Sequence, residues 1–286
     1  MEQIHKSRNK CAHFTGELRA TKRISIGESI SIQYVNILEG TIPRREALLE
    51  NWNFLCVCPR CEDPTEFGSY FSAVKCSVCP TGYLLPILHP EEIFICQNCG
   101  TLKSKQEIDS LISPISDQIA KTFKMYVKFI EKLIRKFEKI LELCCGAVLH
   151  ENHYVLNAIR YKIVSVSTKN NMQGSLCHMN LANENFTKTL LGYNNKLIYI
   201  ANLIYPGLNT YHAFLSYYYI LQLKCFYSTE EIREYVKRSY FRNLIIDGIT
   251  TLRLEPDGIH AKMAHELTQF SDMYLDTRLL RKNKLE

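Results

Sequence analysis

Seven of the twelve cysteines fall between residues 56 and 99, and their spacing constrains the fold more than any other feature of this sequence. Two Cys-x-x-Cys pairs, Cys76/Cys79 and Cys96/Cys99, are separated by 16 residues. A Cys-x-x-Cys turn brings two sulfurs to one side, and two such turns supply the four thiolates that hold a zinc ion in a tetrahedron. The sequence therefore predicts a structural zinc site formed by these four residues.

Three further cysteines, Cys56, Cys58 and Cys61, precede these pairs at metal-ligand spacing. Three thiolates leave a zinc site open, which means either a catalytic metal or a fourth ligand from elsewhere in the chain. No general base lies close in the sequence, so we interpret the site as structural and completed at long range. Cys11, the only other cysteine of the N-terminal part, is the internal candidate for the fourth ligand.

A different pairing of the cysteines stays open at this point. Cys58/Cys61 could combine with Cys76/Cys79, which would leave Cys96/Cys99 without a metal. The remaining cysteines lie in helical, apolar contexts and are interpreted as packing residues: Cys144, Cys145, Cys177 and Cys225. His150-x-x-His153 lacks the carboxylate of a metalloprotease motif and is interpreted as a structural motif at a helix start.

Composition excludes several classes of protein. The sequence is 46% apolar and 22% charged, which is typical of a globular chain. The N-terminus has no apolar stretch of signal-peptide length, and no run reaches the roughly 18 apolar residues of a membrane span. We therefore expect a soluble intracellular protein, in which thiols stay reduced and paired cysteines indicate metal. The net charge of +6 is mild, and no basic-aromatic stripe accompanies the cysteines, so direct nucleic-acid binding is not expected.

The chain divides into three parts by composition: residues 1–55, 56–103 and 104–286. In the first part, residues 18–26 and 29–34 have the pattern of two strands, joined by a turn at Ile26-Gly27-Glu28. Two strands are only marginally stable, so something else must cover their apolar face. A helix is expected to follow, with Pro43 in its first turn.

The third part is almost wholly helical in its periodicity. Ser113-Pro114 is interpreted as the N-cap and first residue of a helix of about 30 residues. Ser228-x-x-Glu231 predicts a capping box at another helix, and an apolar stripe runs from Ile259 to Tyr274. The short polar turns favour an array of antiparallel helical hairpins. The fold class expected is therefore α+β, with a small β part, a cysteine-rich segment and a predominantly helical C-terminal part.

Several of these residues together resemble the SMYD (SET and MYND) family. Residues 27–34, Arg44-Arg45 and the run from Trp52 to Cys61 resemble the end of a SET domain and its post-SET zinc motif. The continuation Asp63-Pro64-Thr65-Glu66 and the two later cysteine pairs look most like the arthropod SMYD-A branch. The resemblance implies a C-terminal SET remnant over residues 1–55, a post-SET zinc segment over 56–103 and a TPR-like helical domain over 104–286.

The resemblance also implies a chemistry. The family transfers a methyl group from S-adenosylmethionine to a protein lysine, so a protein substrate or partner is implied, with histones and other chromatin proteins among the candidates. Tyr34 matches the SET tyrosine that would orient the amine, and Phe54 matches the aromatic that would pack on the adenine of the cofactor. One or two structural zinc ions are implied as well.

The sequence departs from the family at its beginning. It contains neither the glycine-containing cofactor loop of the SET domain nor the Asn-His-Ser-Cys motif, because residues 8–11 read Arg-Asn-Lys-Cys. In the family the cysteine of that motif completes the post-SET zinc site. We therefore expect an incomplete chain, such as a truncated gene model or splice form, that is inactive alone. The alternative is a genuine short protein that acts as a non-catalytic, zinc-containing interaction module through its helical array.

Overall fold

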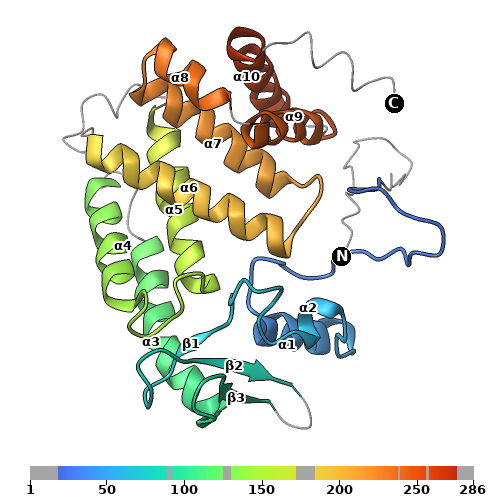
Figure 1. Cartoon of the computed structure of the whole chain (residues 1–286), viewed down its shortest axis with the longest axis vertical. Coiled ribbons are helices and arrows are strands. Elements are labelled where there is room, and N and C mark those ends of the chain that lie inside the picture. Colours follow the sequence, from blue (N-terminus) through green and yellow to red (C-terminus); the bar gives the residue numbers. More distant parts are fainter. Residues whose placement is uncertain are drawn as a thin grey trace. The chain divides into compact units, whose positions relative to one another are not determined.

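The computed structural model describes residues 19–88, 92–124, 130–171, 184–237, 239–255 and 258–275. The chain divides into two compact units, Tyr34–Ser167 and Thr168–Glu286 together with Met1–Gln33. The first unit holds the cysteine-rich segment, and the second consists of the later helices (Figure 1). Among the described residues no helix is long and apolar enough to cross a membrane.

Helix α1, Thr41–Trp52, opens the first unit with Pro43 in its first turn, as the sequence predicts. It ends at Asn53, whose left-handed backbone (φ 54°) lets its N–H bond the carbonyl of Leu49. The short helix α2, Pro59–Glu62, begins directly after the extended residue Cys58. Cys56 and Cys58 therefore lie between the two helices, and Cys61 lies in α2.

A four-stranded antiparallel sheet follows in the order β1-β2-β3-β4. Its strands are Val74–Lys75, Tyr83–Ile87, Ile93–Cys96 and Leu102–Ser104. In a meander of this kind the first and third connections lie at the same end of the sheet. Those two connections carry the two Cys-x-x-Cys turns, so the topology brings the turns together.

The helical periodicity after the sheet belongs to two helices. Helix α3, Lys105–Phe123, begins at an N-cap formed by Ser104, whose side chain and that of Glu107 complete a capping box. Helix α4 spans Ile130–Cys144. The expectation of one 30-residue helix opening at Ser113-Pro114 is wrong, because Pro114 lies inside α3. The rings of Phe123 and Phe137 are 5.2 Å apart, whereas a continuous helix would separate them by about 21 Å.

Helix α5, Tyr154–Asn171, packs its buried residues into the core of the first unit near its start. That core is built from aliphatic and aromatic side chains of α3, α4 and α5, with Ile108, Ile134, Phe137 and Leu156 all buried, and Leu149 of the connection between α4 and α5 is buried as well. The amphipathic pattern of α4 accounts for its position, because its buried residues recur at helical spacing.

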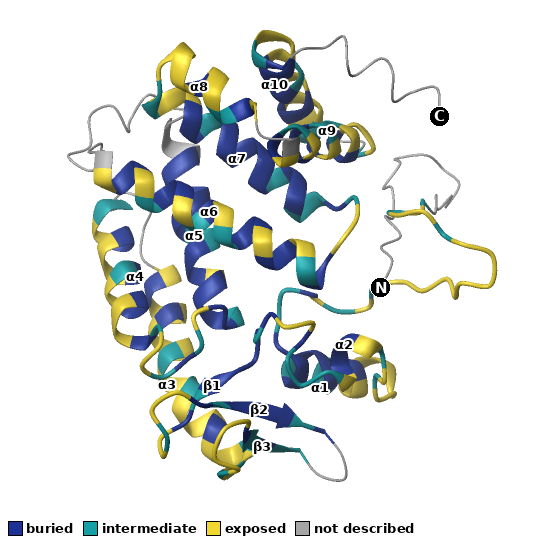
Figure 2. Ribbon diagram, viewed as in Figure 1, coloured by how far each residue is buried: buried dark blue, intermediate teal, exposed yellow. Residues whose placement is uncertain are grey.

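The second unit is an array of helices. They are α6 (Glu184–Ile204), α7 (Thr210–Phe226), α8 (Thr229–Val236), α9 (Ser239–Arg253) and α10 (Gly258–Tyr274). Helix α7 packs against α6 and α9, and α9 packs against α10. Most residues of α7 are buried (Figure 2), which agrees with an apolar sequence on all its sides. Ser228 and Glu231 form the predicted capping box at α8, and Met263, Leu267 and Phe270 are buried in α10. The predicted helical C-terminal part is thus confirmed.

The two strands expected before Tyr34 do not form. Residues 19–40 contain no strand, although the turn at Gly27 is present, with φ +85° and a hydrogen bond of 3.0 Å from Glu28 N to Ser25 O. Ile26, Ile30 and Ile32 are exposed. The described residues leave these apolar side chains at least 40% exposed, and a lone pair of strands is unstable without an apolar cover. The sheet of the protein lies in the cysteine-rich segment instead.

Candidate functional site

The first candidate metal centre is formed by Cys76, Cys79, Cys96 and Cys99, whose sulfur atoms all lie within 4.8 Å of one another. The Cys76–Cys99 and Cys79–Cys96 sulfur pairs are 3.7 and 3.6 Å apart. Four thiolates at about 2.3 Å from a central zinc ion would be about 3.8 Å from each other. The four residues therefore fit one tetrahedral zinc ion.

A glycine leaves the space for these sulfurs. An ideal Cβ on Gly82 would lie 2.4 Å from the sulfur of Cys96 and 2.5 Å from that of Cys79. Gly82 directly precedes β2, and its carbonyl oxygen accepts a hydrogen bond of 3.0 Å from Cys76 N. The backbone of the connection therefore passes directly beside the metal centre, where no side chain fits.

Hydrogen-bond donors lie beside the sulfurs of Cys76, Cys79 and Cys99. Val78 N donates to the Cys76 sulfur at 3.4 Å, and Asn98 Nδ2 donates to the Cys79 sulfur at 3.6 Å. The hydroxyl of Thr101 lies 3.0 Å from the Cys99 sulfur. The side chain and the backbone N–H of Thr101 lower the pKa of Cys99 to about 6. A thiolate, and not a thiol, is the metal ligand, so these donors prepare the centre.

The second candidate metal centre groups the sulfurs of Cys56, Cys58 and Cys61, again within 4.8 Å of one another. Helix α2 produces this geometry, because Cys61 N bonds the carbonyl of Cys58 at 2.8 Å and folds the chain back. A hydrogen bond from the Cys61 thiol lowers the pKa of Cys58 to about 5, and the same hydrogen bond raises the pKa of Cys61. Cys11, the predicted fourth ligand, lies outside the described residues. The three thiols offer most of a zinc coordination shell.

The structure decides between the two pairings that the sequence leaves open. The sulfurs of Cys76/Cys79 gather with those of Cys96/Cys99, and the three earlier cysteines form a separate cluster. The alternative, in which Cys58/Cys61 share a metal with Cys76/Cys79, does not agree with this arrangement.

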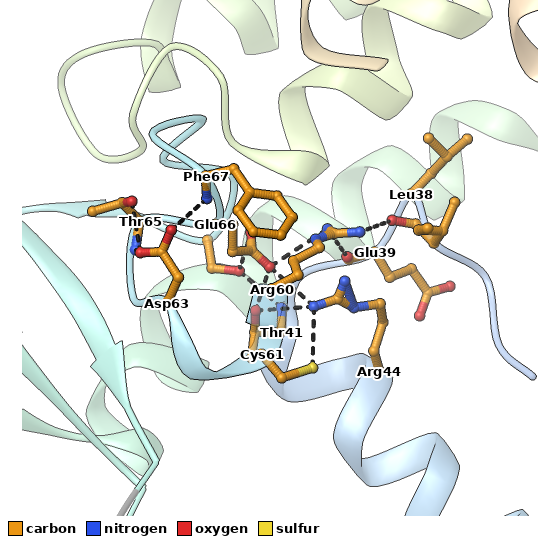
Figure 3. A network of polar contacts seen from close by, with 12 residues as sticks. Leu38, Glu39, Thr41, Arg44, Arg60, Cys61, Asp63, Thr65, Glu66 and Phe67 are labelled. Atoms are coloured by element: carbon orange, nitrogen blue, oxygen red, sulfur yellow. Dashed lines mark hydrogen bonds and ion pairs between the residues drawn. The ribbon is translucent and has the colours of Figure 1, made fainter. Parts of the chain in front are cut away.

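A buried ionic network next to the second centre is not visible in the sequence pattern (Figure 3). Glu66 has no exposed side-chain surface, and its Oε1 atom accepts from Arg44 Nη2 at 3.2 Å and from Arg60 Nη2 at 3.4 Å. The hydroxyl of Thr41 also bonds this carboxylate. Burial lowers the pKa of Arg60 to about 10. Arg44 Nη2 lies 3.6 Å from the Cys61 sulfur, so the network reaches the candidate metal ligands.

Tyr34 and Phe54, the two residues matched to the methyl-transfer site, lie together. Their ring centroids are 5.7 Å apart, and Trp52 stands edge-on to Tyr34 at 4.9 Å. All three side chains are exposed. Phe54 is two residues from Cys56, so this aromatic cluster and the second metal centre belong to one continuous stretch of chain. The sequence pattern alone does not predict the place of Trp52 in the cluster.

The other histidines and cysteines have structural roles or lie outside the site. His153 is buried before α5, and its Nδ1 accepts from Val155 N at 3.3 Å, as expected of a helix-start motif. His150 stacks on Tyr70. Cys144 is buried and Cys145 is half-buried, but Cys225 is exposed and the interpretation of it as a packing residue is wrong. Cys225 lies near the end of α7, and the apolar sequence of this helix does not predict that its side chain is exposed. Cys177 lies outside the described residues.

Comparisons with known proteins place the sequence beside SET-domain proteins. It is 44% identical over 57 residues to the SET domain-containing protein SmydA-8, isoform B, of Drosophila melanogaster, which covers 20% of this chain and 13% of that protein. It is 29% identical over 157 residues to the histone-lysine N-methyltransferase ASHR1 of Arabidopsis thaliana, covering 44% of this chain and 32% of that protein.

A third relative is the histone-lysine N-methyltransferase SET5 of Saccharomyces cerevisiae, with 52% identity over 46 residues, 16% of this chain and 9% of that protein. No family model matches the sequence. The matches span no more than about a third of the length of these curated relatives. Over the part that they cover, the chain is similar to SET-domain proteins, SmydA-8 among them.

Proposed function

We propose that this chain supplies part of a SET-type protein-lysine methyltransferase that uses S-adenosylmethionine. The observation that carries the proposal is the exposed cluster of Tyr34, Trp52 and Phe54, placed directly before a three-cysteine metal centre. The relatives named as histone-lysine methyltransferases support it. Histones and other chromatin proteins are accordingly the proposed substrates, in the nucleus or cytoplasm.

Each aromatic residue has a role in this proposal. The Tyr34 hydroxyl orients the substrate lysine and favours its neutral amine, whose nitrogen lone pair is the nucleophile. With the cofactor held there, the amine nitrogen would accept its methyl group, and the sulfur would keep the electrons of the carbon–sulfur bond. Phe54 offers an apolar face for the adenine. S-Adenosylmethionine, when bound, supplies the activated methyl group.

The metal centres have a supporting role. Zinc at Cys76, Cys79, Cys96 and Cys99 stabilises the sheet, and zinc at Cys56, Cys58 and Cys61, with Cys11 or another fourth ligand, fixes the chain that follows Phe54. We propose no catalytic role for either ion, since no described general base lies within hydrogen-bonding distance of the sulfurs.

The proposal includes an expectation for the 286-residue chain on its own. Its sequence holds neither the glycine-containing cofactor loop nor the Asn-His-Ser-Cys motif of the family. Calorimetry with S-adenosylmethionine should therefore show no saturable binding, because most contacts to the cofactor and the positioning of its methyl group are missing. Saturable binding would contradict this expectation.

The coding sequence upstream of Met1 gives the second part of the test. An in-frame extension that encodes both missing elements should yield a protein that binds S-adenosylmethionine and methylates histones. In that protein Tyr34→Phe should lower turnover by about 10²-fold or more, with Tyr70→Phe as the control. Unchanged turnover in Tyr34→Phe would refute the assigned role. A stop codon directly upstream, with a folded chain that binds no cofactor, would favour the interaction module.

A further inference from the structure

The network around Glu66 carries more positive than negative charge. Arg44 and Arg60 have side chains that are 2% and 3% exposed, and both bond the one buried carboxylate of Glu66. A buried charge is strongly unfavourable unless it is paired and hydrogen-bonded. Within the group formed by Arg44, Arg60 and Glu66, one carboxylate offsets one guanidinium, so one unit of positive charge remains to be compensated. Arg45, which is also buried, makes no hydrogen bond or ion pair to this group among the described residues.

The hydrogen bonds of the two arginines differ. Arg60 donates from Nη1 to the carbonyl of Ile37 at 2.7 Å and from Nη2 to that of Glu39 at 3.1 Å. Arg44 has no backbone acceptor among the described residues, and its Nε and Nη1 atoms are buried without a hydrogen-bond partner there. Its Nη2 atom contacts Thr41, Glu66 and the sulfur of Cys61. The uncompensated charge therefore lies beside a candidate metal ligand (Figure 3).

We propose that Arg44 is a positioning residue for the metal centre at Cys56, Cys58 and Cys61. Its guanidinium donates a hydrogen bond to the Cys61 sulfur and stabilises that sulfur as a metal-bound thiolate. Three thiolates exceed the charge of one Zn²⁺ by one negative unit, and a fourth thiolate would only add to it, so the centre offers negative charge that compensates the positive charge left over in the network. Loss of a residue that holds a metal ligand in this way typically lowers metal affinity by about 10- to 100-fold.

Glu66 fixes the position of Arg44. The loop that carries Glu66 has left-handed backbone at Glu66 (φ 49°) and Phe67 (φ 61°), a conformation that non-glycine residues adopt only when their surroundings hold it. The Asp63 carboxylate holds this loop by accepting from Thr65 N at 2.8 Å and Phe67 N at 2.7 Å. Ser72 Oγ donates to the second carboxylate oxygen of Glu66 at 3.3 Å. The Glu66 side chain is therefore directed inward, onto Arg44.

The inference rests on the candidate metal centre and not on the proposed methylation, so each can fail separately. The test compares Arg44→Gln with Arg45→Gln in the full chain. Arg45 is the next residue of α1 and is equally buried, but it makes no hydrogen bond to the three sulfurs among the described residues. Pulsed alkylation at buffered free zinc, read by mass spectrometry, reports separately on the peptide with Cys56, Cys58 and Cys61 and on the peptides with the four cysteines of the first metal centre.

Arg44→Gln should need roughly 10- to 100-fold more free zinc for half-protection of the Cys56–Cys61 peptide, with no change at the other four cysteines. Arg45→Gln should leave both centres unchanged. Equal zinc dependence in the two variants would overturn the proposal, as would the absence of zinc protection at Cys56, Cys58 and Cys61 in the unmodified chain. If circular dichroism shows that Arg44→Gln does not fold, the zinc dependence of alkylation is compared between Arg44→Lys and Arg45→Lys instead. Lysine keeps the charge but loses the planar fork of the guanidinium, so only Arg44→Lys should need more free zinc.

Discussion

Gly82 lies so close to the sulfurs of the first metal centre that no larger residue fits at this position. Its ideal Cβ would meet the sulfurs of Cys79 and Cys96 at distances that real Cβ atoms do not show. Gly82→Ala must therefore displace a thiolate or the backbone beside it. We expect zinc affinity at this centre to fall at least about tenfold, as for the loss of a supporting residue around a metal. Zinc-buffered alkylation of Cys79 and Cys96 measures the loss.

The control for this substitution is Gly192→Ala in α6, where an added Cβ meets nothing within 4 Å. Removing a glycine from a helix interior should raise the free energy of unfolding by about 0.5–1 kcal/mol and leave zinc binding unchanged. A Gly82→Ala chain that binds zinc as tightly as the Gly192→Ala chain would show that the backbone does not approach the sulfurs as described.

His153 predicts a dependence of stability on pH. Burial, helped by the charge of His150, lowers the pKa of His153 to about 3, whereas an unfolded histidine titrates near 6.5. Below pH 6.5 His153 therefore binds a proton in the unfolded chain, whereas in the folded chain it stays neutral down to about pH 3. Stability contributed by this residue is complete above pH 6.5 and is lost as the pH falls, with a slope of at most about 1.4 kcal/mol per pH unit.

His153→Asn tests this assignment, because Asn can still cap α5 but does not titrate. Urea unfolding between pH 7.5 and 5.5 should show a smaller loss of stability in His153→Asn than in the unmodified chain, and no such difference for His265→Asn on the exposed side of α10. Identical pH slopes in all three chains would contradict a buried neutral His153. Zinc loss at low pH affects the three chains alike and cancels in the comparison.

The residues of the metal centres were predictable, and those of the Glu66 network were not. Cys-x-x-Cys spacing predicts which residues are the ligands and that the two sulfurs of each pair lie on one side of a turn. The burial of Glu66 depends on a loop with left-handed residues that are not glycine, and no local sequence pattern predicts such a conformation. Arg44 and Arg45 stand side by side in the sequence, yet only the folded chain shows that one of them reaches a cysteine sulfur.

At the scale of elements, the start of α3 shows which of two local signals sets the first residue of the helix. Ser104-Lys-Gln-Glu107 is a capping-box sequence, and the structure uses it. Ser113-Pro114 has the form of a second helix start, but the helix continues through Pro114 because Ile108 and Ile119 are buried on either side of it. The loss of one backbone hydrogen bond at a proline is thus outweighed by packing on both flanks.

Ser104→Ala should lower the free energy of unfolding by about 1 kcal/mol, because it leaves the N–H of Glu107 without its side-chain acceptor. Ser110→Ala in the same helix is the matched control, since that hydroxyl bonds only the preceding turn at Gln106 O. It should change stability by a few tenths of a kcal/mol. Amide hydrogen exchange in the first turn of α3 measures both effects. Equal protection in the two variants would argue against the capping box.

The helical elements were predicted more successfully than the strands for a physical reason. A helix satisfies its own backbone hydrogen bonds, so its periodicity and caps are local; the capping box at Ser228 appears as expected. Residues 29–34 alternate in the manner of a strand, but Ile30 and Ile32 find no partner strand among the described residues and stay exposed. A strand forms only when another strand pairs with it.

At the scale of the whole molecule, the chain has two compact units with separate cores. The unit Tyr34–Ser167 contains all the candidate metal ligands among the described residues. The helices α7, α9 and α10 bury their own apolar side chains, among them Leu215, Ile245, Leu267 and Phe270. The division of the sequence into residues 1–55, 56–103 and 104–286 stays a prediction.

Removal of zinc should therefore affect the two units unequally. A chelator should abolish amide protection in the strands between Val74 and Ser104, since metal binding and folding of a small sheet are coupled. Protection in α7, α9 and α10 should persist, because their stability comes from apolar packing. Hydrogen exchange with mass spectrometry resolves these segments. Equal loss of protection in both units would show that the helical array depends on the metal.

The coordination of the first metal centre is the most direct test of the account. X-ray absorption at the zinc edge, on a Cys58→Ser chain that isolates Cys76, Cys79, Cys96 and Cys99, measures the atoms bound to the ion. The account predicts one zinc per chain with four sulfur neighbours at about 2.3 Å. A folded chain without zinc, or a shell that contains nitrogen or oxygen ligands, would contradict it.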